Sequence, residues 1–508
     1  MQDATNNLGW LTGLELVCRV QVPARDREFF GQIQEAWRQV VGSVGQAFRG
    51  GVSAWAMLSW ERALARTLRE MGRLFVEQVM NRIEPEDERE LPQHERFDGE
   101  FYRRKQKSSL RNLNCTFGPI ELTRCLYQPL ESSGRCLFPL ERRLGIVGGV
   151  ATPALADAAA QAAADQPQRQ VLGGLKERHG VTWSAQTLRK VVVAVSELYT
   201  PQRPEAQVEM LLSWLKQAAD STGRHTPVLS VGRDGIMLPI VARDKYSEGS
   251  TATVAVFDRN KKRLGTIYLG EMPESGQAAL SESLTRLITD VLKRCEGTLP
   301  KLNYVTDGGH HPTEYFETVL SPMPDPRRPD KTLSWEWIID YYHACQYITL
   351  LAEALFGPGR AAFAWAKKQR QVLKTKDGGV FRVLRSAGAL RTARGLVGSA
   401  EDYFRGYRYL RERAAKMNYA AALRRGLPIG SGVTEAGCKT LFTQRFKQSG
   451  MKWTITGGQP ILNLRTISLS RVWPTVRDRA WQSYETHLPP TQIAKPNFKS
   501  HKPRKLAV

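Results

Sequence analysis

Residues 426–439 read Gly-Leu-Pro-Ile-Gly-Ser-Gly-Val-Thr-Glu-Ala-Gly-Cys-Lys. The proline and the glycines before Glu435 predict a loop, and the residues after it predict a helix. Glu435 therefore stands at a predicted helix start, where the helix dipole favours an acidic side chain. The following turns carry four basic residues: Lys439, Arg445, Lys447 and Lys452. The stretch thus places one carboxylate beside a basic segment.

Two further acids lie upstream, at apparent strand ends. Asp234 occurs in Gly-Arg-Asp-Gly and Asp307 in Val-Thr-Asp-Gly-Gly. Asp-Gly is a common turn dipeptide, so either aspartate alone predicts no more than a turn. Divalent metal ions bind carboxylate oxygens, and a pair of ions serves phosphodiester chemistry. With Glu435, the three separated carboxylates favour a metal-dependent enzyme that acts on nucleic-acid phosphates.

The charge of the chain agrees with a polyanionic partner. Its 508 residues include 73 lysines and arginines against 50 aspartates and glutamates, a net charge of +23. Such an excess favours nucleic acid as the partner, although charge alone is also compatible with a generally basic protein. Hydrophobic residues make up 42% of the chain, which allows roughly three or four folding units with sizeable cores.

The seven cysteines are odd in number and scattered, which does not resemble a disulfide framework. Cys115, Cys125 and Cys136 fall in one segment, but without a paired Cys-x-x-Cys they are read either as remnants of a zinc site or as ordinary thiols. No signal peptide and no long uncharged apolar run is evident. We therefore expect a cytoplasmic, nucleoid-associated protein with no membrane partner.

The N-terminal 200 residues predict three regions. Residues 1–95 are helical, with an interruption at Gly50-Gly51, and residues 96–150 form a small β-hairpin region around Gly118-Pro119. Residues 151–200 predict a helix-turn-helix with helices at 153–165, 168–178 and 185–199. In that motif the last helix enters the major groove, and its early turns carry the candidate DNA contacts Gln186, Arg189 and Lys190. A plain helical hairpin is the alternative.

The remaining chain predicts an α/β core. Its expected elements are three strands (227–241, 251–257, 263–269), a helix (276–294), a strand (302–306), a short helix (311–320) and a strand (334–341). This is the order of a ribonuclease-H-like fold, with helices packed on a sheet. We assign residues 201–345 to the first part of that core and 426–475 to the last part, with a basic helical insertion at 346–425 and a basic tail at 476–508.

This fold would bring the three acids together. Neighbouring strands lie about 4.8 Å apart, so Asp234 and Asp307 can meet, and Glu435 would join them from a helix beside the sheet. Asp340 and His343 follow the fifth strand. They are read either as a strand-end acid and a hydrogen-bonded histidine, or as accessory residues with His343 near the scissile phosphate or behind a metal ligand.

The order of these motifs resembles bacterial insertion-sequence transposases of the ISKra-like family, which are similar to the wider DDE transposases. The resemblance covers roughly residues 110–470, including Ile-Asp-Tyr-Tyr-His at 339–343 and Gln-Arg-Phe-Lys-Gln-Ser-Gly-Met-Lys-Trp at 444–453. It implies that Asp234, Asp307 and Glu435 are a metal-binding catalytic triad, and that Asp340 and His343 match an accessory Asp-x-x-His motif.

The resemblance also implies two Mg²⁺ ions, with Mn²⁺ as an alternative, and a ribonuclease-H-like core with a helical insertion. The partners would be double-stranded DNA, both element terminal inverted repeats and target, and a second copy of the chain that holds the other end. The reaction would be cleavage followed by 3′-hydroxyl attack on target DNA. The sequence departs from the expected pattern at Arg233, where a smaller or apolar residue is more usual.

Further candidate DNA contacts follow Glu435. Lys439, Arg445, Lys447 and Lys452 would bind phosphates, and Trp453 would stack on an unpaired base. Lys439 alternatively forms an ion pair with Glu435, four residues earlier on the helix. The same residues fit two other functions, a ribonuclease-H-fold nuclease that cuts without joining and a non-catalytic helix-turn-helix DNA-binding protein.

Overall fold

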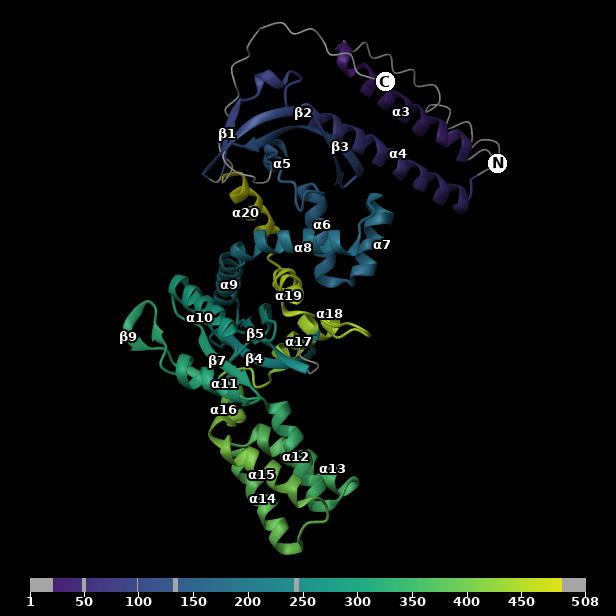
Figure 1. The fold of residues 1–508 in the computed structure, drawn as a ribbon. Helices are drawn as coiled ribbons and strands as arrows, with labels where there is room; N and C mark the ends of the chain where they lie inside the picture. Colours follow the sequence, from purple (N-terminus) through teal and green to yellow (C-terminus); the bar gives the residue numbers. More distant parts are fainter. Residues whose placement is uncertain (1–21, 48–51, 98, 131–135, 242–245, 487–508) are drawn as a thin grey trace. The chain divides into compact units, whose positions relative to one another are not determined.

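The computed structural model describes residues 22–47, 52–97, 99–130, 136–241 and 246–486 (Figure 1). These residues form two compact units. One contains the described residues up to Val195 and those from Trp481 onward, and the other runs from Ser196 to Ala480. In the described ranges, no helix combines the length and the apolar character needed to span a lipid bilayer.

Two long helices and a three-stranded antiparallel sheet open the first unit. The elements are α3 (Arg27–Ala47), α4 (Ala54–Asn81), β1 (His94–Phe97), β2 (Glu100–Cys115) and β3 (Gly118–Pro129), with sheet order β1-β2-β3. The side chain of Asn81 ties α4 to β3, because it donates to Glu121 O (2.8 Å) and accepts from Thr123 N (2.7 Å). The predicted hairpin is confirmed, but its turn is Thr116-Phe117, so Gly118-Pro119 already belongs to β3.

Four helices follow in the same unit: α5 (Pro139–Arg143), α6 (Pro153–Asp165), α7 (Gln168–His179) and α8 (Ala185–Tyr199). The predicted bounds of α6 and α8 are confirmed, and α7 is one residue longer than predicted. α7 ends at Gly180, whose φ of +67° lies in the left-handed region that favours glycine. Ser184 caps α8 as predicted, since its Oγ accepts from Thr187 N (3.0 Å).

A five-stranded mixed sheet with the spatial order β10-β7-β4-β5-β6 is the centre of the second unit. The strands are β4 (Val228–Pro239), β5 (Tyr246–Phe257), β6 (Arg263–Glu271), β7 (Lys301–Thr306) and β10 (Trp335–Ile339). β5 is antiparallel to both of its neighbours, β4 and β6, whereas β7 is parallel to β4 and β10 is parallel to β7. The predicted α/β architecture and all five predicted strands are present.

Helices cover both faces of this sheet. α9 (Arg203–Asp220) and α10 (Ala278–Arg294) share one face, because Gly265 of β6 faces Trp214 of α9 and Arg233 of β4 bonds to α10. α17 (Gly432–Cys438) and α19 (Ile455–Leu469) lie on the other face, where Gly232 of β4 faces Thr434 of α17 and Gly270 of β6 faces Leu462 of α19.

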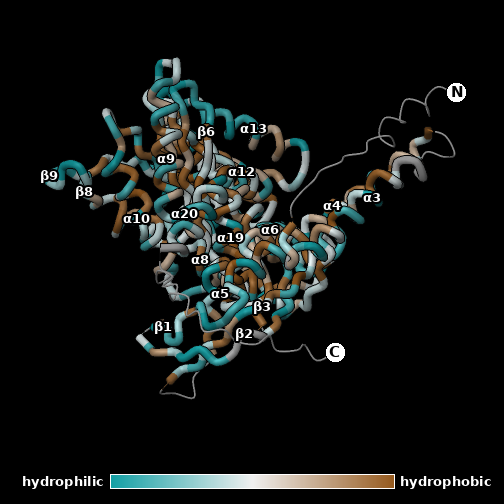
Figure 2. The backbone as a smooth tube through the Cα atoms, turned by 90° about the horizontal axis from the view of Figure 1, so that it is seen from above, coloured by the Kyte–Doolittle hydropathy of each residue, from teal (hydrophilic) through white to brown (hydrophobic). Residues whose placement is uncertain are grey.

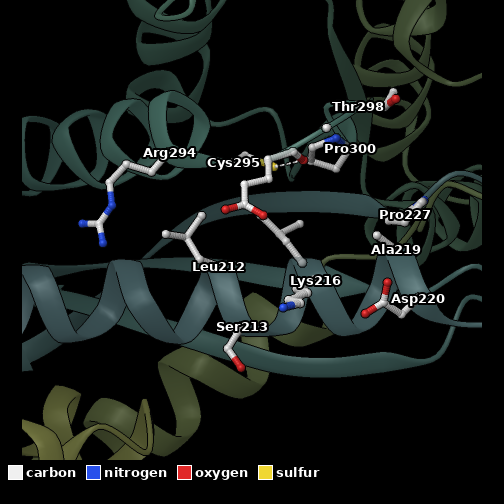
Figure 3. A pocket seen from close by; sticks show the side chains of 13 residues that line it. Leu212, Ser213, Lys216, Ala219, Asp220, Pro227, Arg294, Cys295, Thr298 and Pro300 are labelled. Carbon is white, nitrogen blue, oxygen red and sulfur yellow. Dashed lines mark hydrogen bonds between the residues drawn. The ribbon is translucent and has the colours of Figure 1, made fainter.

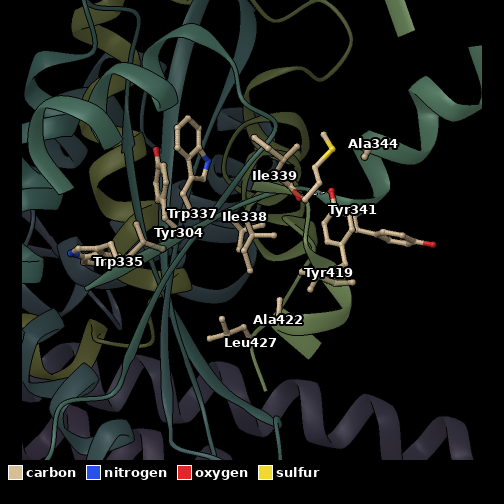
Figure 4. Close-up of a cluster of buried hydrophobic side chains, with 14 of the residues drawn as sticks. Tyr304, Trp335, Trp337, Ile338, Ile339, Tyr341, Ala344, Tyr419, Ala422 and Leu427 are labelled. Carbon is tan, nitrogen blue, oxygen red and sulfur yellow. Dashed lines mark hydrogen bonds between the residues drawn. The ribbon is translucent and has the colours of Figure 1, made fainter. Parts of the chain in front are cut away.

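The helical insertion expected after β10 is present. It comprises α12 (Tyr341–Phe356), α13 (Arg360–Thr375), α14 (Gly379–Arg394), α15 (Ala400–Glu412) and α16 (Tyr419–Arg424). Its buried side chains belong to the same hydrophobic cluster as those of β10 and β7 (Figure 4). Tyr419 Oη donates to Ile339 O (2.9 Å), and the rings of Tyr341 and Tyr419 meet edge to face. The insertion therefore shares its core with the sheet.

The remaining elements of the second unit are shorter. α11 (His310–Tyr315) continues into a π-helical turn (Phe316–Leu320), and a small hairpin follows, made of β8 (Pro324–Asp325) and β9 (Arg328–Thr332). Every residue of β9 is exposed, and Figure 2 shows this strand as hydrophilic. α18 (Gln444–Phe446) precedes α19, and α20 (Trp473–Thr486) is the last described helix. The sequence did not predict the β8–β9 hairpin.

Several expectations need correction. Asp234-Gly235 does not interrupt a strand, because both residues pair with β5 inside β4. Residues 84–95 are not part of the helical region predicted for 1–95, since Glu84 is buried and accepts from Cys125 N (2.9 Å) and β1 begins at His94. Residues 476–486 are helical rather than tail. The expected interruption at Gly50-Gly51 and the basic segment after residue 486 lie outside the described residues.

Candidate active site

The register of the parallel strands β4 and β7 places two of the predicted acids, Asp234 and Asp307, at matching positions along their strands. Val231 of β4 pairs with Tyr304 of β7, and this is the last pairing between these strands. Asp234 and Asp307 each follow their paired residue by three positions, 234 − 231 = 3 and 307 − 304 = 3. Asp234 is held within β4 by its pairing with Thr251, whereas Asp307 directly follows β7. Both aspartates thus lie toward the carboxyl end of adjacent parallel strands.

Asp340 joins them from the third parallel strand. Ile339 of β10 pairs with Thr306 of β7, so Asp340 and Asp307 are the next residues of neighbouring strands. The amide of Asp340 donates to Thr306 O (2.8 Å). Three aspartates from three adjacent strands therefore lie at one edge of the sheet.

The alternation of β4 selects the face on which Asp234 stands. Gly232 and Asp234 share a face, and Arg233 points to the opposite one. A Cβ added to Gly232 would lie 1.9 Å from Thr434 Oγ1, so only glycine lets α17 approach β4 this closely. Glu435 is the residue after Thr434. The close contact at Gly232 therefore brings Glu435 to the face that carries Asp234.

The electrostatics agree with this convergence. Burial raises the pKa of Asp234, and the carboxylates of Asp307 and Glu435 raise it further. The Cys438 thiol and the Gly235 amide (2.8 Å) donate hydrogen bonds to Asp234 and lower its pKa. Asp307 and Glu435 thus each repel Asp234, and a bound cation would relieve this repulsion.

Asp340 is a fully buried carboxylate that connects three segments. Its oxygens accept from the amides of Tyr342 (3.1 Å) and His343 (3.2 Å), which caps α12, and from the amide of Ser431 (3.1 Å), which holds the loop before α17. These three backbone amides satisfy the Asp340 carboxylate, as is typical of an acid with a structural role. Asp340 therefore fixes the relative positions of β10, α12 and α17.

Glu435 is bonded to this same network. Ser431 Oγ donates to Glu435 Oε1 (2.8 Å). Burial raises the pKa of Glu435, as do a hydrogen bond and repulsion from Asp340, while Ser431 and His343 lower it. His343 is half-buried and packs edge to face on Tyr347 (5.4 Å) and Tyr409 (5.7 Å). The predicted accessory pair therefore lies beside the predicted triad.

The insertion supplies residues that the sequence did not indicate. Tyr409 of α15 donates through Oη to Asp307 O (2.6 Å), and Arg413 donates to Gly308 O (3.1 Å). The Tyr409 ring stacks on Tyr347 at 3.7 Å between ring centroids. Tyr409 lies 102 residues after Asp307, and no local pattern separates it from an ordinary core aromatic. The insertion thus holds the backbone at Asp307 and Gly308 through these two hydrogen bonds.

Arg233 is also explained by its surroundings. It is buried on the α10 face, where it donates to Ser281 Oγ (2.9 Å) and Gln277 Oε1 (2.9 Å) and lies over the Tyr315 ring (4.4 Å). Burial lowers the pKa of Arg233. The guanidinium therefore links β4 to α10 behind Asp234 and does not enter the acid cluster.

The candidate DNA-binding residues have different environments. Gln186, Arg189 and Lys190 are exposed on α8, and Lys439, Lys447 and Lys452 are exposed in the second unit. Among the described contacts, none is an ion pair between Lys439 and Glu435. These six side chains are accessible to a partner.

Arg445 requires a correction. It is only 1% exposed, and its guanidinium lies 5.1 Å from the Trp453 ring centroid. Trp453 is half-buried, its indole N–H donates to Phe446 O (3.0 Å), and its backbone bridges to Ile240 at the end of β4. Arg445 therefore stabilises this segment from inside and cannot contact a surface phosphate in this conformation, and Trp453 already stacks within the protein.

The cysteines of the hairpin region do not gather into a metal site in the part of the chain that the structure describes. Cys115 and Cys125 belong to separate hydrophobic clusters, and Cys136 is exposed.

A cavity of about 580 Å³ lies away from the acids (Figure 3). Its lining includes Lys216 and Asp220 of α9, Cys295 after α10, and Pro227 and Pro300, which precede β4 and β7. It therefore opens near the amino ends of the strands whose carboxyl ends carry the aspartates.

Comparison of the sequence with protein-family models and with curated proteins gives no match in either set.

Proposed function

We propose that this protein is a metal-dependent DNA transposase of the DDE type, with Asp234, Asp307 and Glu435 as its catalytic acids. The observation that carries the proposal is their convergence at the carboxyl edge of the mixed sheet, where the carboxylates of Asp307 and Glu435 add to the burial that raises the pKa of Asp234. The strand order β10-β7-β4-β5-β6 supports a ribonuclease-H-like core.

The donor set fits magnesium, with manganese as an alternative. Mg²⁺ prefers hard oxygen ligands, and the cluster offers carboxylates whose repulsion a divalent ion would neutralise. Asp234 and Asp307 would hold the two ions and Glu435 would complete the second position. When bound, such ions stabilise charge on the attacking and leaving oxygens of a phosphodiester.

The protein's own residues would orient these acids. Ser431 holds the Glu435 carboxyl through its hydroxyl, and Asp340 holds the loop that carries Ser431. Tyr409 and Arg413 fix the backbone around Asp307. Such preorganisation matters because small misplacements of catalytic groups lower rates severely.

Double-stranded DNA, as element ends and as target, is the proposed substrate, and a second copy of the chain would hold the other end. The net charge of +23 supports a polyanionic partner. The three helices α6, α7 and α8 support a helix-turn-helix in which Gln186, Arg189 and Lys190 contact DNA, since all three are exposed. Lys439, Lys447 and Lys452 would bind phosphates near the acids.

The test supplies the element's own ends, pre-cut with free 3′-hydroxyls, together with a target plasmid and Mg²⁺. Wild type should join ends to target, and Asp234→Asn, Asp307→Asn and Glu435→Gln should each abolish joining while end-DNA binding persists. Asp330→Asn is the matched control, because it removes an exposed carboxylate on β9. Cleavage without joined products would indicate a nuclease. End binding with neither reaction in the wild type would indicate a non-catalytic DNA-binding protein.

A further inference from the structure

Three side chains at the start of α11 form a compact group of nitrogen and oxygen ligands. Nδ1 of His310 and Nδ1 of His311 each lie 3.8 Å from Glu314 Oε2. The ligand atoms of the three residues all lie within 4.8 Å of one another, and no other such group occurs among the described residues. The sequence predicted a short helix over 311–320, and α11 begins one residue earlier, so both histidines occupy its first turn.

We propose that His310, His311 and Glu314 bind a transition metal of the Zn²⁺, Co²⁺ or Ni²⁺ class, at a site separate from the carboxylate cluster. The ligand chemistry distinguishes the two sites. Imidazole nitrogens suit zinc, cobalt and nickel, while all-carboxylate sites suit magnesium and manganese. This inference does not depend on the proposed transposase activity.

The spacing explains why the three side chains converge. Glu314 follows His310 by four residues and His311 by three, and both separations place side chains on one helical face. The helical segment runs without a break from His310 to Leu320, so Glu314 is held on a continuous backbone. Tyr304 Oη donates to Pro312 O (3.0 Å) and Thr313 Oγ1 donates to Gly309 O (2.7 Å). The first turn is therefore anchored before any metal binds.

The observed distances are close to those of a bound ion. Zinc–nitrogen bonds of about 2.0–2.1 Å in tetrahedral geometry separate ligand atoms by roughly 3.3 Å. The two nitrogen–oxygen distances of 3.8 Å exceed this separation by only about 0.5 Å, and the two nitrogens lie within 4.8 Å of each other, so side-chain rotations have to close gaps of at most about 1.5 Å. Nδ1 of His311 is shielded from solvent and has no hydrogen-bond partner within the described ranges. An unsatisfied buried ring nitrogen is costly, and metal coordination would satisfy it.

The position of this group links it to Asp307. The amide of Gly309 donates to Asp307 Oδ1 (2.8 Å), and His310 is the next residue. A metal held by His310, His311 and Glu314 would restrain this turn, and with it the Gly309 amide that orients the Asp307 carboxylate.

Cobalt titration of the untagged, metal-free full chain tests the proposal, because Co²⁺ with nitrogen ligands gives visible absorption bands. The wild type should bind one Co²⁺ with such bands, zinc should displace it, and excess Mg²⁺ should not. The His310→Ala/His311→Ala double variant should lose the bands, and Glu314→Gln should weaken binding at least about tenfold. The three side chains are at least 34% exposed, so thermal melting should confirm that these variants fold.

Two controls separate this site from others. His225→Asn changes a histidine elsewhere in the second unit and should leave the titration unchanged. Asp307→Asn disables the carboxylate cluster and should retain the cobalt bands. Bands that persist in the double variant, or that disappear with Asp307→Asn, would overturn the assignment.

Discussion

Gly232→Ala should damage both stability and catalysis, because it separates α17 from β4. The new Cβ would lie 1.9 Å from Thr434 Oγ1, 3.1 Å from Thr434 Cβ and 3.2 Å from Val305 O. Since real Cβ contacts are longer than 3.0 Å, α17 or β4 must shift by more than 1 Å at this point. Thr434 also shares a hydrogen bond with Thr253 (2.7 Å), so it has little freedom to rotate away.

The expected loss of stability is about 1–3 kcal/mol, the usual range for overpacking a close contact. Glu435 moves with Thr434, and a displacement near 1 Å at a catalytic group lowers the rate roughly 100-fold. Urea unfolding of the full chain measures the first quantity, and the end-joining reaction measures the second.

Gly235→Ala is the matched control in the same strand. Its Cβ would meet only the end of the Glu248 side chain, an exposed and flexible group that can swing away. The Gly232→Ala/Thr434→Ala double variant should recover part of the lost stability, because it removes the clashing oxygen. If Gly232→Ala matches Gly235→Ala in both measurements, α17 is not held against β4 as described.

Three other substitutions test the surroundings of the acids. Burial and the neighbouring acids raise the pKa of Asp234 in the folded chain, so ionisation of this carboxyl destabilises the folded state as the pH rises above about 4. In metal-free buffer Asp234→Asn should therefore be more stable than wild type at pH 8 and equal to it below about pH 4, as measured by urea unfolding at each pH. Arg233→Met should destabilise the chain by about 2 kcal/mol in the same assay, since Ser281 and Gln277 lose their buried donor; an unchanged midpoint would contradict the account of Arg233. Tyr409→Phe removes the hydroxyl that donates to Asp307 O, so it should lower end joining about tenfold at saturating Mg²⁺ and lower the free energy of unfolding by less than about 1.5 kcal/mol. Full activity of this variant would show that the hydrogen bond to Asp307 O is dispensable.

Periodicity and turn residues predicted the five strands and helices such as α6, α8 and α10 because those signals are local, whereas α9, α19 and α20 were not predicted. The location of Asp234 was wrong for the same reason. Asp-Gly usually marks a turn, but here Gly235 lies inside β4 beneath the Glu248 side chain, a neighbour from the next strand. The pairing that decides between turn and strand is not visible in the surrounding residues.

Tertiary contacts also decided the environments that the sequence missed. Arg445 resembles its basic neighbours in sequence, yet the bridge between Trp453 and Ile240 folds its segment so that the guanidinium is enclosed. Tyr409 reaches Asp307 across 102 residues through the packing of α15 on α12. Neither contact leaves a periodic pattern, whereas the acids at the sheet edge follow from strand register.

The late position of Glu435 in the chain has a consequence during synthesis. Ninety-five residues separate it from Asp340, and almost all of them form the insertion (435 − 340 = 95). At about 5–20 residues per second, the ribosome needs roughly 5–20 s to cross this distance. The aspartates are therefore translated well before Glu435, and chains that are nascent or terminated prematurely lack the complete set of proposed catalytic acids. Under the proposed transposase function, unfinished copies of the chain would therefore be unable to cut DNA.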